Sequence, residues 1–226
     1  MAAALMCAVI GLSAGYVAYS ATGTSPSATA SGRPAGGLGS AGAGSNARSG
    51  PASGGAAGTV GSVSTSGFTM STSTGQKVTV DETSSTTYQN GTSSTSASAI
   101  TTGEDVLVLG TTSGTTITAA QVIVQPAGGG GSTASSAAGV VPFQPGAPST
   151  SKQVGQIPAN YSQGSGTIVS GSTAYSATEA ALAAYPGGVV DRVVQLSDGE
   201  YEVHYIGVNW PHHIFVSQDF KVVGAN

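Results

Sequence analysis

The alternation of apolar and polar residues is clearest in the last fifty residues of the chain. Two β-branched runs, Val189 to Leu196 and Glu200 to Ile206, flank Asp198-Gly199, which is typical of a β-hairpin with a two-residue type I′ turn. The pattern resumes from His213 to Ser217 and from Lys221 to Val223. These runs predict an antiparallel sheet.

A short helix is predicted just before this sheet. Ser176 and Glu179 have the spacing of a capping box, so the helix is expected to begin at Ala177. It should end by Tyr185, because Pro186 disfavours the α conformation of the residue before it. Alanines at helical spacing give a small-residue face that can approach the sheet closely. Residues 174–226 therefore predict a small α+β domain, a helix on an antiparallel sheet.

The expected register divides the hairpin residues between two faces of the sheet. The face predicted to contact the helix carries Val190, Val194, Leu196, Tyr201, Val203 and Tyr205. The other face, predicted to be more hydrated, carries Val193, Gln195, Glu202 and His204.

The order of these elements resembles a known family. An Ala-rich helix ends in Pro186-Gly187-Gly188, and Asp198-Gly199, Tyr201-Glu202-Val203 and Lys221-Val222-Val223 follow in turn. This series resembles a PepSY domain, a bacterial cell-envelope module related to protease propeptides. The resemblance covers roughly residues 174–225 and implies an inhibitory or regulatory role. Residues 208–213 depart from the family pattern.

Residues 59–125 show a second pattern, with short β-branched runs separated by turn signals. The turn signals are Ser66-Gly67, Thr74-Gly75, Asn90-Gly91 and Ser113-Gly114. Their spacing predicts a small all-β fold, an OB-like barrel or half-barrel of five strands. The series Gly58 to Val63, Thr74 to Val80, Thr86 to Tyr88, Gly103 to Gly110 and Thr118 to Val122 resembles the DUF5666 family, an extracytoplasmic β module of unknown activity.

Composition predicts that these two modules are separated by linkers. Only 7% of the 226 residues are charged and 35 are glycine, whereas about 25% charged residues is usual. Residues 22–58 and 126–173 consist mainly of Gly, Ser, Ala, Thr and Pro, so we expect a disordered tether and a disordered linker. Ile168-Val169 is expected to dock as an extra edge strand. The predicted fold class is therefore multi-domain.

The start of the chain, residues 1–21, is apolar and uncharged from Ala2 to Ala21. It is long enough to span a bilayer, and Ala18-Tyr19-Ser20 equally fits a signal-peptide cleavage site. Arg33 and Arg48 follow this segment and taken alone favour a cytoplasmic C-terminus. The composition of the rest is that of an exported passenger and outweighs them. The protein is predicted to be membrane-anchored with extracytoplasmic domains, or secreted.

The residues that could carry chemistry are few. Lys77 is the only basic residue of the predicted barrel, and Phe68 and Tyr88 are its only aromatic residues, so nucleic-acid binding is not expected. Cys7 lies in the apolar start, and most serines lie in low-complexity segments. We therefore expect no catalytic residue and no cofactor.

The three histidines, with Glu202, are a possible zinc set. His212 and His213 are adjacent, and neighbours on a strand point to opposite faces, so the sequence favours exposed histidines over a metal site. Trp210 could close one end of the core or serve as an exposed recognition residue. The predicted partner-contact residues are Gln195, Glu202, His204, Trp210, His212 and His213.

Two functions follow as hypotheses. The first is a non-catalytic protein that binds or regulates an exported or envelope partner, with an exported protease as a candidate through the PepSY resemblance. The second is a structural surface or wall-spanning spacer with no tight partner. The N-terminal apolar segment is the predicted contact with the membrane in both.

Overall fold

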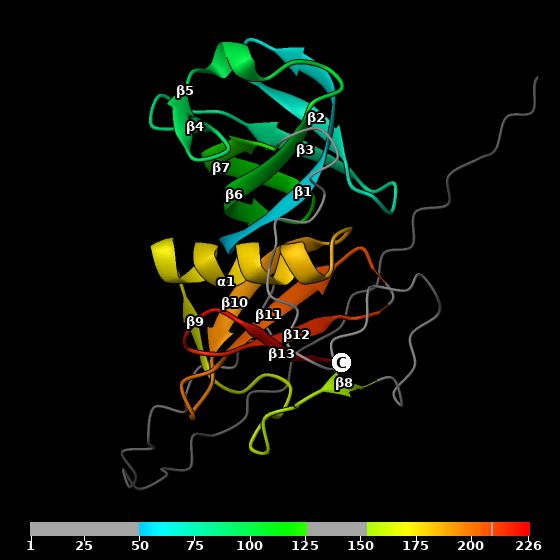
Figure 1. The fold of residues 1–226 in the computed structure, drawn as a ribbon, viewed down its shortest axis with the longest axis vertical. Coiled ribbons are helices and arrows are strands. Elements are labelled where there is room, and N and C mark those ends of the chain that lie inside the picture. The colour runs from blue at the N-terminus through cyan, green and yellow to red at the C-terminus, as the bar shows by residue number, and fades with distance from the viewer. Residues whose placement is uncertain (1–49, 126–152, 209) are drawn as a thin grey trace, which may run out of the picture. The chain divides into compact units, whose positions relative to one another are not determined.

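The computed structural model describes residues 50–125, 153–208 and 210–226, and in these ranges the chain is mostly β with one α-helix (Figure 1). The predicted apolar start, most of the predicted tether and residues 126–152 of the predicted linker lie outside the described residues. No helix in the described ranges is long and apolar enough to cross a membrane.

The first part is a closed five-stranded barrel. Its strands are β1 (Ala52–Ser64), β2 (Gly67–Ser71), β3 (Lys77–Asp81), β6 (Asp105–Ser113) and β7 (Thr116–Val124). They pair in the ring β1-β2-β3-β7-β6, and β3 and β7 are parallel while the other neighbours are antiparallel. The predicted small five-stranded barrel is confirmed.

A short hairpin and one helical turn complete this part. They are β4 (Thr87–Asn90), β5 (Ser93–Thr95) and a 3₁₀ turn (Ala97–Ala99). β4 continues along the same edge of β7 that β3 occupies. Alternate residues of the barrel strands point inward and form a core that includes Phe68, Met70, Val108 and Ile117.

β1 begins seven residues before the predicted barrel boundary. Residues 52–58, predicted as part of the tether, form the first half of this strand. The prediction of a tether is wrong here, because glycine is common in flexible tethers and also where two backbones lie in close contact. A Cβ at Gly54 would lie 2.0 Å from Val190 O, and one at Gly58 would lie 2.4 Å from Ser71 O. These glycines allow backbones to approach closely.

The second part is an antiparallel sheet with a helix on one face. Its elements are β8 (Val154–Gly155), β9 (Thr167–Val169), α1 (Gly171–Ala184), β10 (Val189–Gln195), β11 (Tyr201–Ile206), β12 (His213–Val216) and β13 (Val222–Ala225). The sheet order is β9-β10-β11-β12-β13-β8. The predicted helix on an antiparallel sheet and the predicted edge strand at Ile168-Val169 are both present.

The helix starts six residues earlier than predicted. Its N-cap is Ser170, whose side chain makes no capping hydrogen bond, so Ser176 and Glu179 lie inside the helix and form no capping box. The small-residue face is confirmed, since Ala174, Ala177 and Ala181 are fully buried in the cluster that joins α1 to the sheet.

The hairpin between β10 and β11 has a three-residue loop rather than the predicted two-residue turn. Gly199 N–H donates to Leu196 O (3.0 Å), Leu196 N–H donates to Glu200 O (2.8 Å), and Gly199 has a positive φ of 87°. Gln195 therefore pairs with Tyr201 and Val194 with Glu202. The extra residue moves the β10 register by one position.

This shift exchanges the predicted faces of β10. Val193 packs in the cluster under α1, whereas Val194 and Leu196 pack with Phe215 on the opposite face. A further irregularity between Val190 and Arg192 restores Val190 to the helix side. The predictions for Tyr201, Val203 and Tyr205, which all contact the helix cluster, are correct.

The sheet face opposite α1 is also covered. Ile157 and Tyr161, from the segment predicted as linker, pack against the cluster of Val194, Leu196 and Phe215. This part of the predicted linker thus forms structure that the low apolar density of the segment did not indicate.

Barrel and sheet residues also contact each other. Gly55 and Ala56 of β1 pair with Val190 and Val189 of β10. Leu107 and Leu109 of β6 belong to the apolar cluster that contains α1. Independent folding of the two parts stays a prediction. Each part folded alone would lose these contacts.

Two buried tyrosines lead to a prediction about alkaline pH. Burial raises the pKa of Tyr185 to about 12, and burial with the neighbouring Tyr185 raises the pKa of Tyr205 well above its ordinary value. In the unfolded chain both should ionise near the ordinary value of about 10. Above that pH the unfolded state loses protons that the folded state retains, so the free energy of unfolding should fall as pH rises towards 12.

Urea denaturation at a series of pH values from 9 to 12 measures this slope. Tyr185→Phe is the matched variant, because the Tyr185 hydroxyl is buried without a hydrogen-bond partner among the described residues. It should make the alkaline decline shallower with little loss of stability at neutral pH. Tyr205→Phe removes the hydrogen bond from Tyr205 OH to Tyr185 O (3.0 Å), so it should lower stability at neutral pH. Because it also removes a buried phenol, it should make the alkaline decline shallower. Equal alkaline slopes in the wild type and Tyr185→Phe would contradict the assignment.

Candidate functional site

Glu202 is a buried carboxylate at the centre of the sheet face opposite α1. Its side chain is only 1% exposed, and Nδ1 of His213 donates to its Oε1 at 2.6 Å. The Tyr161 hydroxyl lies 3.4 Å from the same oxygen. Burial, and then the Glu202 charge, raise the pKa of Tyr161 above its ordinary value. Glu202 Oε2 is buried and has no hydrogen-bond partner among the described residues.

A second ionic group lies beside Glu202. Nδ1 of His204 donates to Asp191 Oδ1 at 2.6 Å, and Arg192 Nη1 donates to Asp191 Oδ2 at 2.9 Å. Arg192 and His204 are brought together because they are cross-strand partners in β10 and β11. Asp191 was not among the predicted site residues, and its role depends on the irregularity in β10 that no sequence signal marks.

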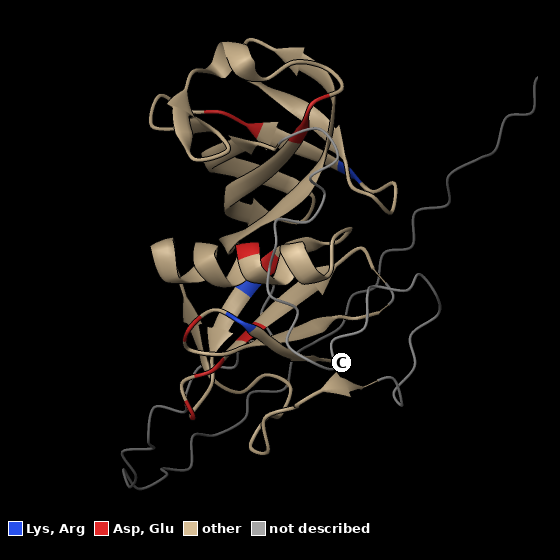
Figure 2. Cartoon of the chain, viewed as in Figure 1, with Lys and Arg blue, Asp and Glu red and all other residues tan. Residues whose placement is uncertain are grey.

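The predicted open face is therefore a largely covered polar cluster. Glu202 is buried, and His204 and His213 are partly buried. The expectation that Glu202 and His204 are freely exposed is wrong, because Tyr161 and Phe215 cover this face. Figure 2 shows how few charged residues the described chain has, so the ion pairs here are a distinctive feature.

The three histidines lie close to one another. Ring centroids are 5.1 Å apart for His204 and His213, and 6.4 Å apart for each of the pairs with His212. His212 precedes β12 and places its Nδ1 3.3 Å from Tyr205 O. The prediction that two adjacent histidines point to opposite faces of a strand does not apply, since only His213 is in the strand. Within the described ranges no group of three or more His, Cys, Asp or Glu is placed to hold a metal ion.

Trp210 belongs to the core. It is 5% exposed, and its ring lies edge-on to Tyr185 with centroids 6.4 Å apart. Of the two roles considered for it, the structure agrees with closure of the core. Its side chain is not available as a recognition residue.

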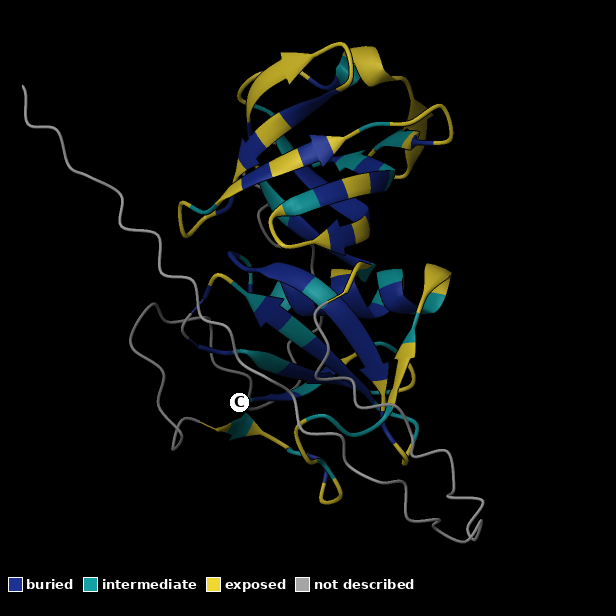
Figure 3. Ribbon diagram, turned by 180° about the vertical axis from the view of Figure 1, so that it is seen from behind, coloured by how far each residue is buried: buried dark blue, intermediate teal, exposed yellow. Residues whose placement is uncertain are grey.

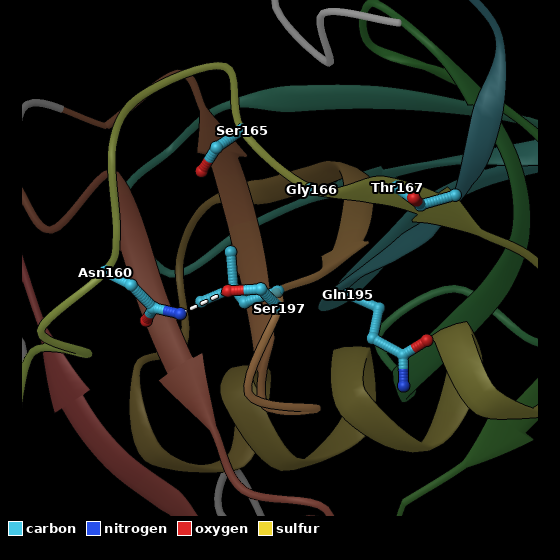
Figure 4. Close-up of a pocket in the computed structure, with 7 residues that line it drawn as sticks. Asn160, Ser165, Gly166, Thr167, Gln195 and Ser197 are labelled. Atoms are coloured by element: carbon cyan, nitrogen blue, oxygen red, sulfur yellow. Dashed lines mark hydrogen bonds between the residues drawn. The ribbon is translucent and has the colours of Figure 1, made fainter. Parts of the chain in front are cut away.

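The sixth predicted contact residue, Gln195, is exposed and lines a pocket. The pocket has a volume of about 320 Å³ and is lined by Asn160, Ser165, Gly166, Thr167, Gln195, Leu196 and Ser197. Figure 4 shows its side chains and the hydrogen bond between Asn160 and Ser197. Every polar side chain in the lining is an uncharged hydroxyl or amide. Gln195 lies on the α1 side of the sheet, because it pairs with Tyr201, and not beside Glu202 as predicted.

This pocket adjoins a strand edge. Thr167, in the pocket lining, is the first residue of β9, which pairs only with β10 among the described strands. Figure 3 shows β9 as an exposed strand beside the buried sheet. Ile168 is 44% exposed, one of two large apolar residues in the described chain with such exposure. The sequence predicted the edge strand, but Asn160 and Ser165 lie in the predicted linker and Ser197 precedes the Asp198-Gly199 turn, and no signal marked them as pocket residues.

Comparisons with protein-family models, with curated proteins and with solved structures found no match to this chain. The resemblances to the DUF5666 and PepSY families therefore stay predictions from the sequence pattern.

Proposed function

We propose that this protein is a non-catalytic extracytoplasmic protein that binds an envelope or exported partner through its C-terminal α+β module. The observation that carries the proposal is the uncharged polar pocket at the start of β9, next to a strand edge with which no described strand pairs. The extracytoplasmic location rests on the apolar start of the chain and on its low charge. By the PepSY resemblance, an exported protease is one candidate partner.

The proposed mode of binding is strand addition. An unpaired strand edge presents backbone N–H and C=O groups that an extended peptide can pair with, and a nearby pocket can select a side chain. β9 contains no charged residue and no proline to oppose such pairing. The pocket next to it offers hydroxyl and amide groups, so an uncharged polar side chain of the partner fits it best.

Two histidines of the C-terminal sheet have carboxylate partners. Here the Nδ1 atoms of His204 and His213 are held by carboxylates that are themselves buried or paired with Arg192. The arrangement is a cluster of hydrogen-bonded polar side chains within the sheet.

A spacer protein without a tight partner is the second candidate. The glycine- and serine-rich segments at residues 22–49 and 126–152 are consistent with it. The two candidates differ in whether they require a binding surface: the binding function requires the exposed apolar edge and the polar pocket beside it, and the spacer function requires neither.

Selection of a random heptamer peptide library on the full chain tests the proposal. We expect enrichment of extended, uncharged peptides. Ile168→Asp should weaken their binding by at least about tenfold, because a charged side chain on an edge strand opposes addition of another strand. Ser197→Trp, which fills the pocket, should change which side chain is preferred.

The matched control is Val63→Asp on the barrel, since Val63 is 48% exposed and Ile168 44%. Peptide binding by this variant should equal that of the wild type. If no peptide is enriched, or if both Asp variants lose binding equally, the spacer function is favoured. Peptides selected in this way can then be matched to exported proteins of the source cell.

A further inference from the structure

Two histidines face each other across neighbouring strands of the C-terminal sheet. His204 of β11 and His213 of β12 are register partners, and their ring centroids are 5.1 Å apart. Each ring is oriented by a carboxylate at Nδ1, Asp191 for His204 and Glu202 for His213. Because Nδ1 of each ring carries the donated proton, Nε2 is the nitrogen of each ring with a lone pair to offer.

We propose that Nε2 of His204 and Nε2 of His213 together bind one divalent transition-metal ion, with water completing the coordination shell. Imidazole suits zinc, copper and nickel, whereas calcium and magnesium prefer oxygen ligands. A histidine that binds a metal usually donates its other ring N–H to a carboxylate or a backbone carbonyl. Asp191 and Glu202 supply that second layer of contacts here.

The ring distances select the pair rather than all three histidines. Two imidazoles that share an ion at about 2.0–2.1 Å from each nitrogen have ring centroids roughly 5 Å apart. The pair of His204 and His213 meets this distance. His212 lies 6.4 Å from both rings, a separation that needs a nearly linear angle at the ion, and it cannot take that angle with both rings at once.

The local charge also favours a cation. Asp191 and Glu202 contribute two negative charges, and Arg192 contributes one positive charge that Asp191 pairs at 2.9 Å. With both imidazoles neutral, the cluster has a net charge of −1. Glu202 Oε2 is buried and without a partner among the described residues, so its charge is not fully compensated by the protein. A bound cation would supply that compensation.

Two metal titrations of the untagged full chain in mild detergent test the proposal. Calorimetry with Zn²⁺ alone should show one ion per chain. Electron paramagnetic resonance of the Cu²⁺ form should show coupling to two nitrogens. His204→Ala and His213→Ala should each weaken Zn²⁺ binding by at least about tenfold, and Asp191→Asn should weaken it by about tenfold through the lost orientation of His204.

His212→Ala is the matched control, because it removes a neighbouring imidazole that the distances exclude. Its Zn²⁺ affinity should stay within about twofold of the wild type, given that no first-shell or orienting group is lost. His204→Gln and His213→Gln, which keep a polar side chain of similar length, serve if an alanine variant fails to fold by circular dichroism.

Three results would overturn the proposal. The first is the absence of both Zn²⁺ heat and Cu²⁺ nitrogen coupling in the wild type. The second is unchanged affinity in folded variants of both His204 and His213. The third is equal loss in His212→Ala or coupling to three nitrogens, which would replace the pair by a different ligand set.

Discussion

Gly54→Ala is expected to lower the free energy of unfolding of this protein by about 3 kcal/mol, a large loss for one added methyl group. The new Cβ would lie 2.0 Å from Val190 O and 3.1 Å from Thr112 Oγ1. The first of these atoms is backbone of β10 and cannot rotate away as a side chain can. The two strands would have to separate where β1 joins the barrel to the C-terminal sheet.

Gly61→Ala is the matched control in the same strand. Its Cβ would have its nearest neighbour, Thr69 Oγ1, at 3.5 Å, which is an ordinary contact. The change should be neutral or stabilising by up to about 1 kcal/mol, because alanine restricts the unfolded chain. Urea denaturation of both variants measures the difference. If Gly54→Ala is as stable as Gly61→Ala, then β1 does not pair with β10 as described.

The second large effect is expected at Glu202. Glu202→Ala should cost about 3 kcal/mol, because it removes one member of a buried pair and leaves His213 without its partner. Glu202→Gln keeps the shape and an acceptor oxygen, so its cost should be smaller. Raising the salt concentration should leave the loss of stability in both variants nearly unchanged, since buried pairs are weakly screened.

Glu179→Ala serves as the comparison for Glu202. Glu179 is exposed on α1, so its replacement should change stability by no more than about 0.5 kcal/mol. Thermal and urea unfolding of the three variants test the prediction. A cost for Glu202→Ala as small as that for Glu179→Ala would mean that Glu202 lies on an open surface, as the register predicted from sequence alone places it.

Several features of the fold could be predicted because they depend on local signals. Short β-branched runs bounded by glycine turns were enough to predict a five-stranded barrel within residues 59–125. The residue before Pro186 ended α1 as expected. Ile168 and Val169 lie in an edge strand, as expected from two adjacent β-branched residues, which favour the β conformation.

Other features could not be predicted because one residue decides them. The loop at Asp198-Gly199 has three residues instead of two, and this single addition moves Val194 from the helix face to the opposite face. Side chains alternate along a strand, so any slip by one exchanges the faces completely. The hydrogen bond from Gly199 N–H to Leu196 O that sets the loop depends on the final backbone path.

The candidate site shows the same division. The sequence alone determined that His204, His213 and Glu202 belong to the C-terminal sheet and that no strongly basic surface is present. Only the tertiary structure decided that Glu202 is buried, because its cover comes from Tyr161, forty-one residues earlier in a segment with the composition of a linker. It likewise decided that Gly54 and Gly55 form a strand. The sequence does not distinguish a glycine that allows two backbones to approach closely from a glycine in a flexible tether, because the difference depends on a neighbouring backbone.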